Sequence, residues 1–313
     1  MSKSLRLRPA ALFLFAFVLS PIRITVAQQK PLTRTFVAST EERYQVTVTI
    51  RVETHGISTE KIGEKTYATP FTHQADGQIS WRSIRQISSL KQDGSAAIIE
   101  TLDRFQATCE EDSNSKSFDA KLQKSVQDTC ANWQNLSQMN YEEEKYGLIR
   151  GLPDSANEMI GSGSPLLSLW LRRAFRPSAI LPKAPLHFGD RTAHRVAANP
   201  STGKSRPEGE ESMEWLEAGG DTPAATLHTS QDLKWTDAPR KSGFSNVGGT
   251  PEKRQLFYAD SLNTISLLDG SLLKASRSAT HETKDTLDHV SGLPDAPEFG
   301  SKLTITVTIL RLP

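Results

Sequence analysis

The chain has only two cysteines in its 313 residues, Cys109 and Cys130. They do not form a Cys-x-x-Cys motif, and no histidine lies between them, so the pattern gives little support to a zinc or thiol-redox pair. In an oxidising compartment such a pair predicts one disulfide. That bond would close a loop of about 20 residues and remove roughly 3 kcal/mol of unfolded-chain entropy. A zinc or redox pair is the alternative.

The sequence also lacks clusters of basic residues. It has 37 Lys plus Arg against 36 Asp plus Glu, scattered along the chain. Without the four cations of residues 1–27, the count becomes 33 against 36, a net charge of about −3. A nucleic-acid-binding surface needs clustered cations, so the composition predicts no nucleic-acid partner.

No apolar run of membrane-spanning length stands at the start of the chain. Lys3, Arg6 and Arg8 precede the apolar run Ala10–Leu19, and small or β-branched residues end at Ala27. The run is well short of the roughly 20 residues that a membrane-spanning helix needs. This pattern predicts a signal peptide over residues 1–27 and a periplasmic or secreted domain over 28–313, with no membrane span after cleavage.

Motifs for nucleophilic catalysis and phosphate binding are missing. Gly161–Ser164 imitates a nucleophile elbow but lacks its fifth-position glycine and preceding strand, which favours a loop. Asn135–Ser137 fits a glycosylation acceptor. The sequence therefore predicts no catalytic residue, no metal site and no cofactor.

Two groups of ligand-type residues nevertheless need an interpretation. His187, Asp190 and His194 would form a metal or general-base site if they converged, but Gly189-Asp190 is typical of a turn. The second group is interpreted as a strand extension followed by a loop, and consists of His281, Glu282, Asp285, Asp288 and His289.

Strict alternation of apolar and polar residues is the strongest structural signal. It covers Tyr44–Val52 and Leu303–Ile309, each with one face for a core. Asp93-Gly94 and Asp269-Gly270 predict two-residue hairpin turns in which both residues have positive φ. We expect a mainly β (α+β) fold, a curved antiparallel sheet or half-barrel with a few short helices. Two pseudo-repeated halves, or two lobes joined near residues 199–211, are alternatives.

Two stretches predict helices. One starts at Ser117 and carries Cys130. The other, Pro165–Phe175, has apolar residues around most of its circumference and is expected to lie on the concave face of the sheet as a lid over a ligand. Its candidate ligand-binding residues are Leu166, Leu169, Trp170, Leu171 and Phe175. The tryptophans are expected mainly in the core: Trp81, Trp133, Trp170, Trp215 and Trp235.

Ala179–Asp190 carries a resemblance. It places Leu181-Pro182 and a Pro-x-x-x-Gly-Asp turn after the short apolar helix, which resembles exported bacterial β-rich proteins of unknown function. Thr192 stands where those proteins more often have a tryptophan. The resemblance implies the half-barrel fold of periplasmic lipoprotein and lipid carriers, which by itself does not determine function.

Three functions compete at this point. The first is an exported non-enzymatic protein with an apolar groove or cavity for a lipid or a lipidated envelope component. The second is a structural or interaction module of the cell envelope without a ligand. The third is a hydrolase that uses His187, Asp190 and His194, which requires the three side chains to converge.

Overall fold

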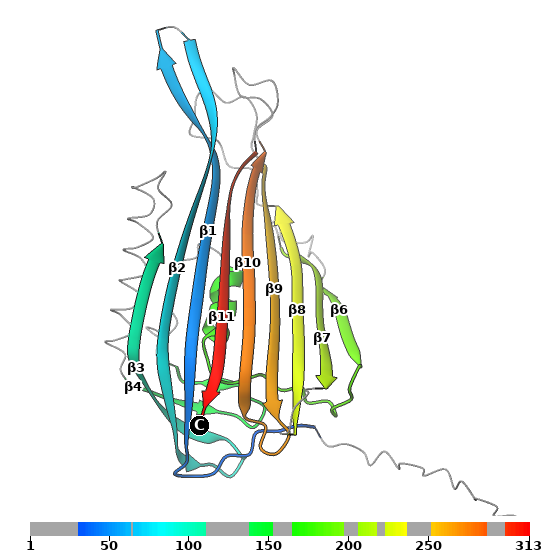
Figure 1. Ribbon diagram of the computed structural model, residues 1–313. Coiled ribbons are helices and arrows are strands. Elements are labelled where there is room, and N and C mark those ends of the chain that lie inside the picture. Colours follow the sequence, from blue (N-terminus) through cyan, green and yellow to red (C-terminus); the bar gives the residue numbers. More distant parts are fainter. Residues whose placement is uncertain are drawn as a thin grey trace, which may run out of the picture.

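A computed structural model describes residues 31–63, 65–110, 138–152, 165–196, 206–217, 223–236, 252–286 and 298–313. In these residues eleven antiparallel strands form one curved, unclosed sheet, and a short helix lies on its concave face (Figure 1). The expected mainly β fold with a curved sheet is confirmed. The elements are β1 (Glu41–Ile62), β2 (Lys65–Leu90), β3 (Ala96–Glu110), β4 (Gln138–Glu143), β5 (Ile149–Arg150), α2 (Pro165–Ala174), β6 (Arg191–Val196), β7 (Glu208–Glu217), β8 (Ala224–Thr236), β9 (Glu252–Ser266), β10 (Leu272–Thr286) and β11 (Glu298–Leu312).

The two strongly alternating runs of the sequence are neighbours at the centre of the sheet. The strand order is β5-β4-β3-β2-β1-β11-β10-β9-β8-β7-β6. Val48 of β1 faces Val307 of β11, and both are buried. The chain therefore starts at the centre, moves out to the β5 edge, crosses to the β6 edge through the connection that contains α2, and returns inward. This crossover places α2 against the concave face.

The apolar core lies between that face and α2. Leu167 and Leu171 are one turn apart on the helix and are fully buried. The ring of Phe175 packs on Trp81 of β2, with 6.1 Å between ring centroids. The predicted packing of the helix is correct for these residues but wrong for Leu169, which is 48% exposed. The helix itself ends at Ala174, one residue before the predicted end.

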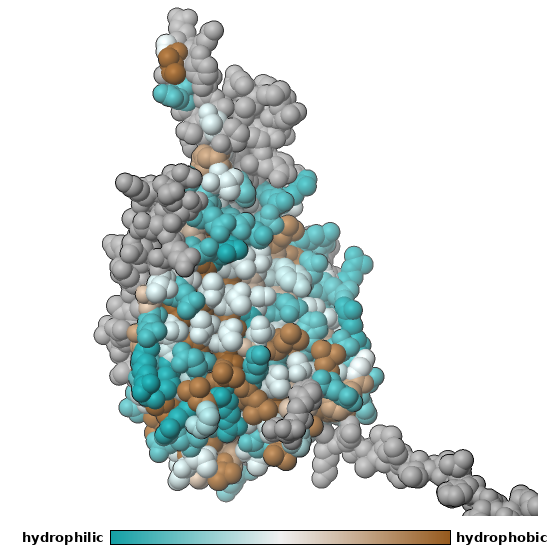
Figure 2. Space-filling model, viewed as in Figure 1, coloured by the Kyte–Doolittle hydropathy of each residue, from teal (hydrophilic) through white to brown (hydrophobic). Residues whose placement is uncertain are grey.

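The convex face has a different composition. Side chains that alternate with the core residues of the central strands are mostly threonine and serine. Figure 2, viewed from this side, shows neutral and hydrophilic residues over the middle of the sheet. Examples are Thr47, Thr49, Thr306, Thr308, Ser276 and Ser278, which face one another across β1, β11 and β10.

Both Asp-Gly hairpins form, but the predicted two-residue turns are wrong. In the first, Gly94 N donates to Lys91 O at 3.1 Å, and the loop between Lys91 and Ser95 has three residues. In the second, Gly270 N donates to Ser266 O at 2.9 Å. The loop between Ser266 and Ser271 has four residues, one more than in the first hairpin.

In both turns only the glycine has positive φ. Each aspartate instead accepts hydrogen bonds from the serine two residues later. Asp93 accepts from Ser95 N and Oγ at 3.0 and 2.7 Å, and Asp269 accepts from Ser271 at the same distances. These bonds hold the aspartate in the turn without left-handed backbone.

Several sequence predictions fall on residues outside the described ranges. They are the signal peptide, the helix from Ser117, the glycosylation acceptor and the Gly161–Ser164 loop. Cys130 is also outside, so the Cys109–Cys130 disulfide stays a prediction. β6 and β7, which flank the predicted lobe junction, lie side by side in the one sheet. Among the described helical residues, none forms a helix long and apolar enough to cross a membrane.

Candidate ligand cleft

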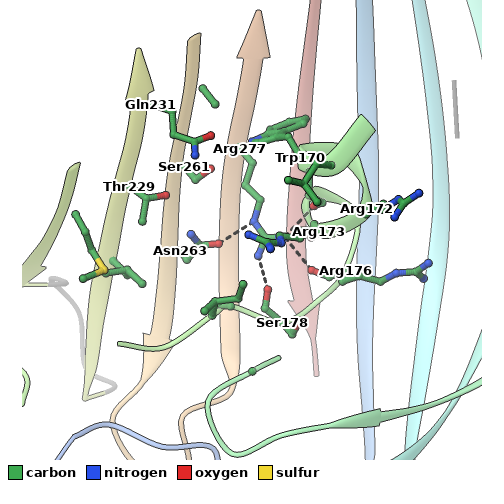
Figure 3. A pocket seen from close by; sticks show the side chains of 18 of the residues that line it. Trp170, Arg172, Arg173, Arg176, Ser178, Thr229, Gln231, Ser261, Asn263 and Arg277 are labelled. Carbon is green, nitrogen blue, oxygen red and sulfur yellow. Dashed lines mark hydrogen bonds between the residues drawn. The ribbon is translucent and has the colours of Figure 1, made fainter. Parts of the chain in front are cut away.

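A cleft with a volume of about 820 Å³ lies between the concave face and the α2 region (Figure 3). Small-molecule sites typically have about 300–1,000 Å³. The geometry of the fold explains its presence. A ten-residue helix is about 15 Å long, whereas eleven strands spaced about 4.8 Å apart span roughly 48 Å. α2 alone therefore covers only part of the concave face.

One side of the cleft is mainly apolar. Leu169 is exposed and Trp170 is half-buried on α2, and Ile180, from the chain after the helix, is 46% exposed. Other apolar lining residues come from the β4–β5 region and from the inward face of β7 and β8: Leu148, Ile149, Leu152, Met213 and Leu227. These side chains provide apolar surface that a ligand could remove from water.

The floor of the cleft is polar. Thr229 of β8 is paired in register with Ser261 of β9, which in turn is paired with Arg277 of β10. Asn263 lies two residues from Ser261 on the same face of β9. Gln231 lies two residues from Thr229 on the same face of β8, on the opposite side of the Thr229–Ser261 pair, where it is paired with Ala259. Ser261, Asn263 and Arg277 are all at least nine-tenths buried. A polar row therefore crosses three adjacent strands beneath the apolar wall.

Arg277 fixes the end of α2 to the floor. Its Nη1 donates to the carbonyl oxygens of Arg173, Ala174 and Arg176 at 3.1, 2.8 and 2.9 Å. Its Nη2 donates to Ser178 O at 2.6 Å (Figure 3). The last carbonyls of a helix lack partners within the helix and carry partial negative charge. A guanidinium at this position satisfies several of them at once.

The Arg277 guanidinium has no carboxylate partner among the described residues. Its remaining bond, from Nε to Asn263 Oδ1 at 2.8 Å, is also to a neutral group. Burial lowers the pKa of Arg277 to about 10, which still leaves it charged at neutral pH. A full positive charge therefore lies at the floor of the cleft, and within the described part of the chain it is balanced by carbonyl and amide dipoles alone.

The structure separates the five predicted ligand residues. Leu169 and Trp170 line the cleft. Leu171 and Phe175 are buried in the core, and half-buried Leu166 packs against it. Sequence reasoning did not find the polar floor. A signal existed for Arg277, because it occupies a core-facing position in the alternation between Ala275 and Ala279.

A second polar cluster, also absent from the sequence predictions, is buried beside the cleft. Arg85 of β2 bonds Tyr141 Oη at 2.9 Å and Glu42 Oε2 at 3.1 Å, and it also pairs with Glu143. Arg34 pairs with Glu42 at 2.6 Å. Among the described residues, this network contains three arginines and three glutamates, whose charges balance: Arg34, Arg85, Arg176, Glu42, Glu100 and Glu143.

This network binds the other side of the α2 segment. Arg85 Nη1 donates to Pro177 O at 3.0 Å from β2, which lies across the central β1–β11 pair from the β10 strand of Arg277. Burial on its own raises the pKa of the Glu42 carboxyl, but Arg85 and Arg34 hold that pKa below its ordinary value. The chain from Arg173 to Ser178 is thus held by arginines from β2 and β10, which gives the cleft a fixed wall.

The histidine groups do not form catalytic or metal centres in the part of the chain that the structure describes. His194 Nε2 lies 2.9 Å from Glu211 Oε2, and its side chain is 66% exposed. His187 and Asp190 are exposed and have no recorded contact with His194. No group of three metal-ligating residues is found in the described ranges. In the second group, His281, Glu282 and Asp285 lie on β10, which agrees with the predicted strand extension. Asp288 and His289 lie outside the described residues, so the predicted loop stays a prediction.

The tryptophans agree in part with the predicted core positions. Trp81 and Trp215 are buried, whereas Trp170 and Trp235 are half-buried and Trp133 lies outside the described ranges.

Comparisons with protein-family models and with curated proteins find no match to this chain. The functional argument therefore depends on the cleft itself.

Proposed function

We propose that this chain is an exported, non-enzymatic binding protein that holds a lipid, or the lipid part of an envelope component, in the cleft. The observation that carries the proposal is the pairing of an 820 Å³ cleft with accessible apolar side chains, above all Leu169 and Trp170. The predicted signal peptide and the resemblance to exported β-rich proteins support a periplasmic or secreted location. No cofactor is part of the proposal.

Burial of apolar surface would supply the binding energy. Each methylene group removed from water contributes about 0.8 kcal/mol. A ligand chain against Leu169, Trp170 and Ile180 would replace water on side chains that the protein leaves partly uncovered. Arg85 and Arg277 already hold the segment after α2 in place, so binding a ligand costs little additional conformational entropy in this segment.

The test is a titration with a hydrophobic dye that gains fluorescence on binding. Trp170→Ala and Leu169→Asn should each weaken dye binding about tenfold, equivalent to about 1.4 kcal/mol. Leu268→Asn is the matched control, because Leu268 is 75% exposed in the β9–β10 turn, away from the cleft. It should leave the titration unchanged.

Stability measurements separate binding from folding. Leu171→Ala should cost about 2–5 kcal/mol of unfolding free energy, since Leu171 is fully buried. Leu169→Asn should cost less than about 1 kcal/mol, because the side chain is half exposed. If folded Trp170→Ala and Leu169→Asn proteins bind the dye as the wild type does, the cleft is not the binding site. A structural or interaction module without ligand would then be favoured.

A further inference from the structure

We propose that the ligand is a free amphiphile with an anionic oxygen headgroup, which binds at the Thr229–Ser261–Arg277 row with its chain against the apolar wall. This inference depends on the proposed function and specifies its ligand. It excludes acyl chains attached to a protein through a neutral ester or amide. The argument comes from the charge, the unused hydrogen-bond donors and the position of the floor.

Of the buried arginines described around the α2 segment, Arg34 and Arg85 have glutamate partners and Arg277 on β10 has none among the described residues. Arg34 and Arg85 each bond glutamates, and burying a charge is costly unless a counter-charge accompanies it. Arg277 is just as deeply buried, and its acceptors among the described residues are all neutral. The described residues that line the cleft include three arginines outside the balanced network and a single glutamate: Arg172, Arg173, Arg277 and Glu211. A fourth lining arginine, Arg176, belongs to the balanced network through Glu100.

The single glutamate does not neutralise Arg277. Glu211 Oε1 accepts from Gln231 Nε2 at 2.7 Å, and Oε2 contacts His194 at 2.9 Å. Its recorded partners are on β8 and β6, at the far side of the floor. A carboxylate or phosphate group of a ligand would therefore supply the missing counter-charge.

Donors for such a group are already in place. The hydroxyls of Thr229 and Ser261 have no hydrogen-bond partner within the described residues. Asn263 uses its Oδ1 for Arg277, which leaves its amide N–H groups available. Arg277 Nη2 carries two N–H groups and has one recorded acceptor, Ser178 O. Bonds from these donors to an anionic oxygen would be charge-assisted and roughly twice as strong as neutral ones.

The experiment varies the ligand rather than the arginine, because removal of Arg277 would also release the end of α2. The purified protein with bound dye is titrated with a long-chain carboxylate, and with the alcohol and the phosphate monoester of the same chain length. The two anions should displace the dye at concentrations at least about ten times lower than the alcohol. Acetate and inorganic phosphate should not displace it, because they lack the chain.

A variant pair connects this preference to the floor. Thr229→Val with Ser261→Ala removes both hydroxyls and should reduce the anion-to-alcohol ratio by about threefold or more. Thr306→Val, on the convex face, should leave that ratio unchanged. Equal displacement by alcohol and carboxylate would overturn the anionic headgroup while leaving the proposed function intact. If acetate or inorganic phosphate competes as well as the long-chain anions, the site binds small anions, and the proposal that its ligand is an amphiphile is wrong. If no long-chain compound displaces the dye, the proposed function fails too.

Discussion

Arg85 and Arg277 are two buried arginines that are satisfied in opposite ways. Arg85 is surrounded by glutamates and tyrosines, and its pKa is held well above the ordinary value despite burial. In the described ranges, Arg277 bonds carbonyl and amide oxygens alone. The first belongs to a balanced network that holds the fold together. The second is a charge at the floor of the cleft without a carboxylate partner among the described residues.

Loss of one acid from the balanced network should be costly. Glu42→Gln should lower the unfolding free energy by about 3–5 kcal/mol, since it leaves Arg34 and Arg85 short of a counter-charge. Urea denaturation at neutral pH measures the change. Glu41→Gln is the control, because the Glu41–Arg43 pair is exposed and is worth about 0–1 kcal/mol. Equal effects of the two substitutions would contradict the role given to the network.

The same residue predicts a pH dependence. The pKa of Glu42 is lower in the folded protein than its ordinary value of 4.5. Its stabilising contribution is therefore complete above pH 4.5 and is lost as the pH falls through the folded pKa. Between pH 4.5 and more acidic values, stability should fall more steeply for the wild type than for Glu42→Gln. Parallel curves for the two proteins would contradict this.

At the scale of elements, the two Asp-Gly hairpins differ in what surrounds their glycines. A Cβ on Gly270 would lie 2.5 Å from the carbonyl oxygen of Thr33, because the chain before β1 crosses this turn. A Cβ on Gly94 would have no neighbour closer than Lys145 Cδ at 3.8 Å. Local conformation is thus similar, but tertiary surroundings are not.

This difference predicts unequal costs for the same substitution. Gly94→Ala should destabilise the protein by about 1–2 kcal/mol, the cost of positive φ for a residue with a side chain. Gly270→Ala has the same backbone cost and also a backbone clash, so about 3 kcal/mol or more is expected. Thermal or chemical denaturation of both variants tests this. A Gly270→Ala protein as stable as Gly94→Ala would show that the chain before β1 can move away.

At the scale of the whole molecule, the sheet is built from its centre outward. β1 and β11 pair over thirteen residues, from Arg43↔Leu312 to His55↔Gly300. At the edges, β5 has two residues and β6 has six. Short edge strands limit edge-to-edge association. The long central pair joins the two halves of the sheet, and its inward-facing side chains, such as Val48 and Val307, are buried.

Native-state hydrogen exchange should reveal this gradient. Backbone amides of Val48 and Val307 should exchange only through global unfolding, whereas those of β6 should exchange through local opening. Added denaturant should accelerate exchange at the two valines steeply and at His194 only weakly. Equal protection at the centre and the β6 edge would contradict the proposed order of stability.

The sequence by itself determined the local structure of the sheet. Alternation in Tyr44–Val52 and Leu303–Ile309 identified strands and their buried faces, since side chains in a strand point to opposite sides in turn. The Asp-Gly pairs located two hairpins, and Pro165 located the start of the helix. These features depend on residues close together in the chain, so a pattern over a few positions is enough to predict them.

Only the tertiary structure decided which strands are neighbours and what the cleft contains. Thr229, Ser261 and Arg277 belong to three strands, and their row exists only because β8, β9 and β10 pair in one register. The partners of Arg277 lie about a hundred residues earlier in the chain, at the end of α2. Burial and hydrogen bonding across such separations depend on the global arrangement of the sheet, and local periodicity carries no information about it.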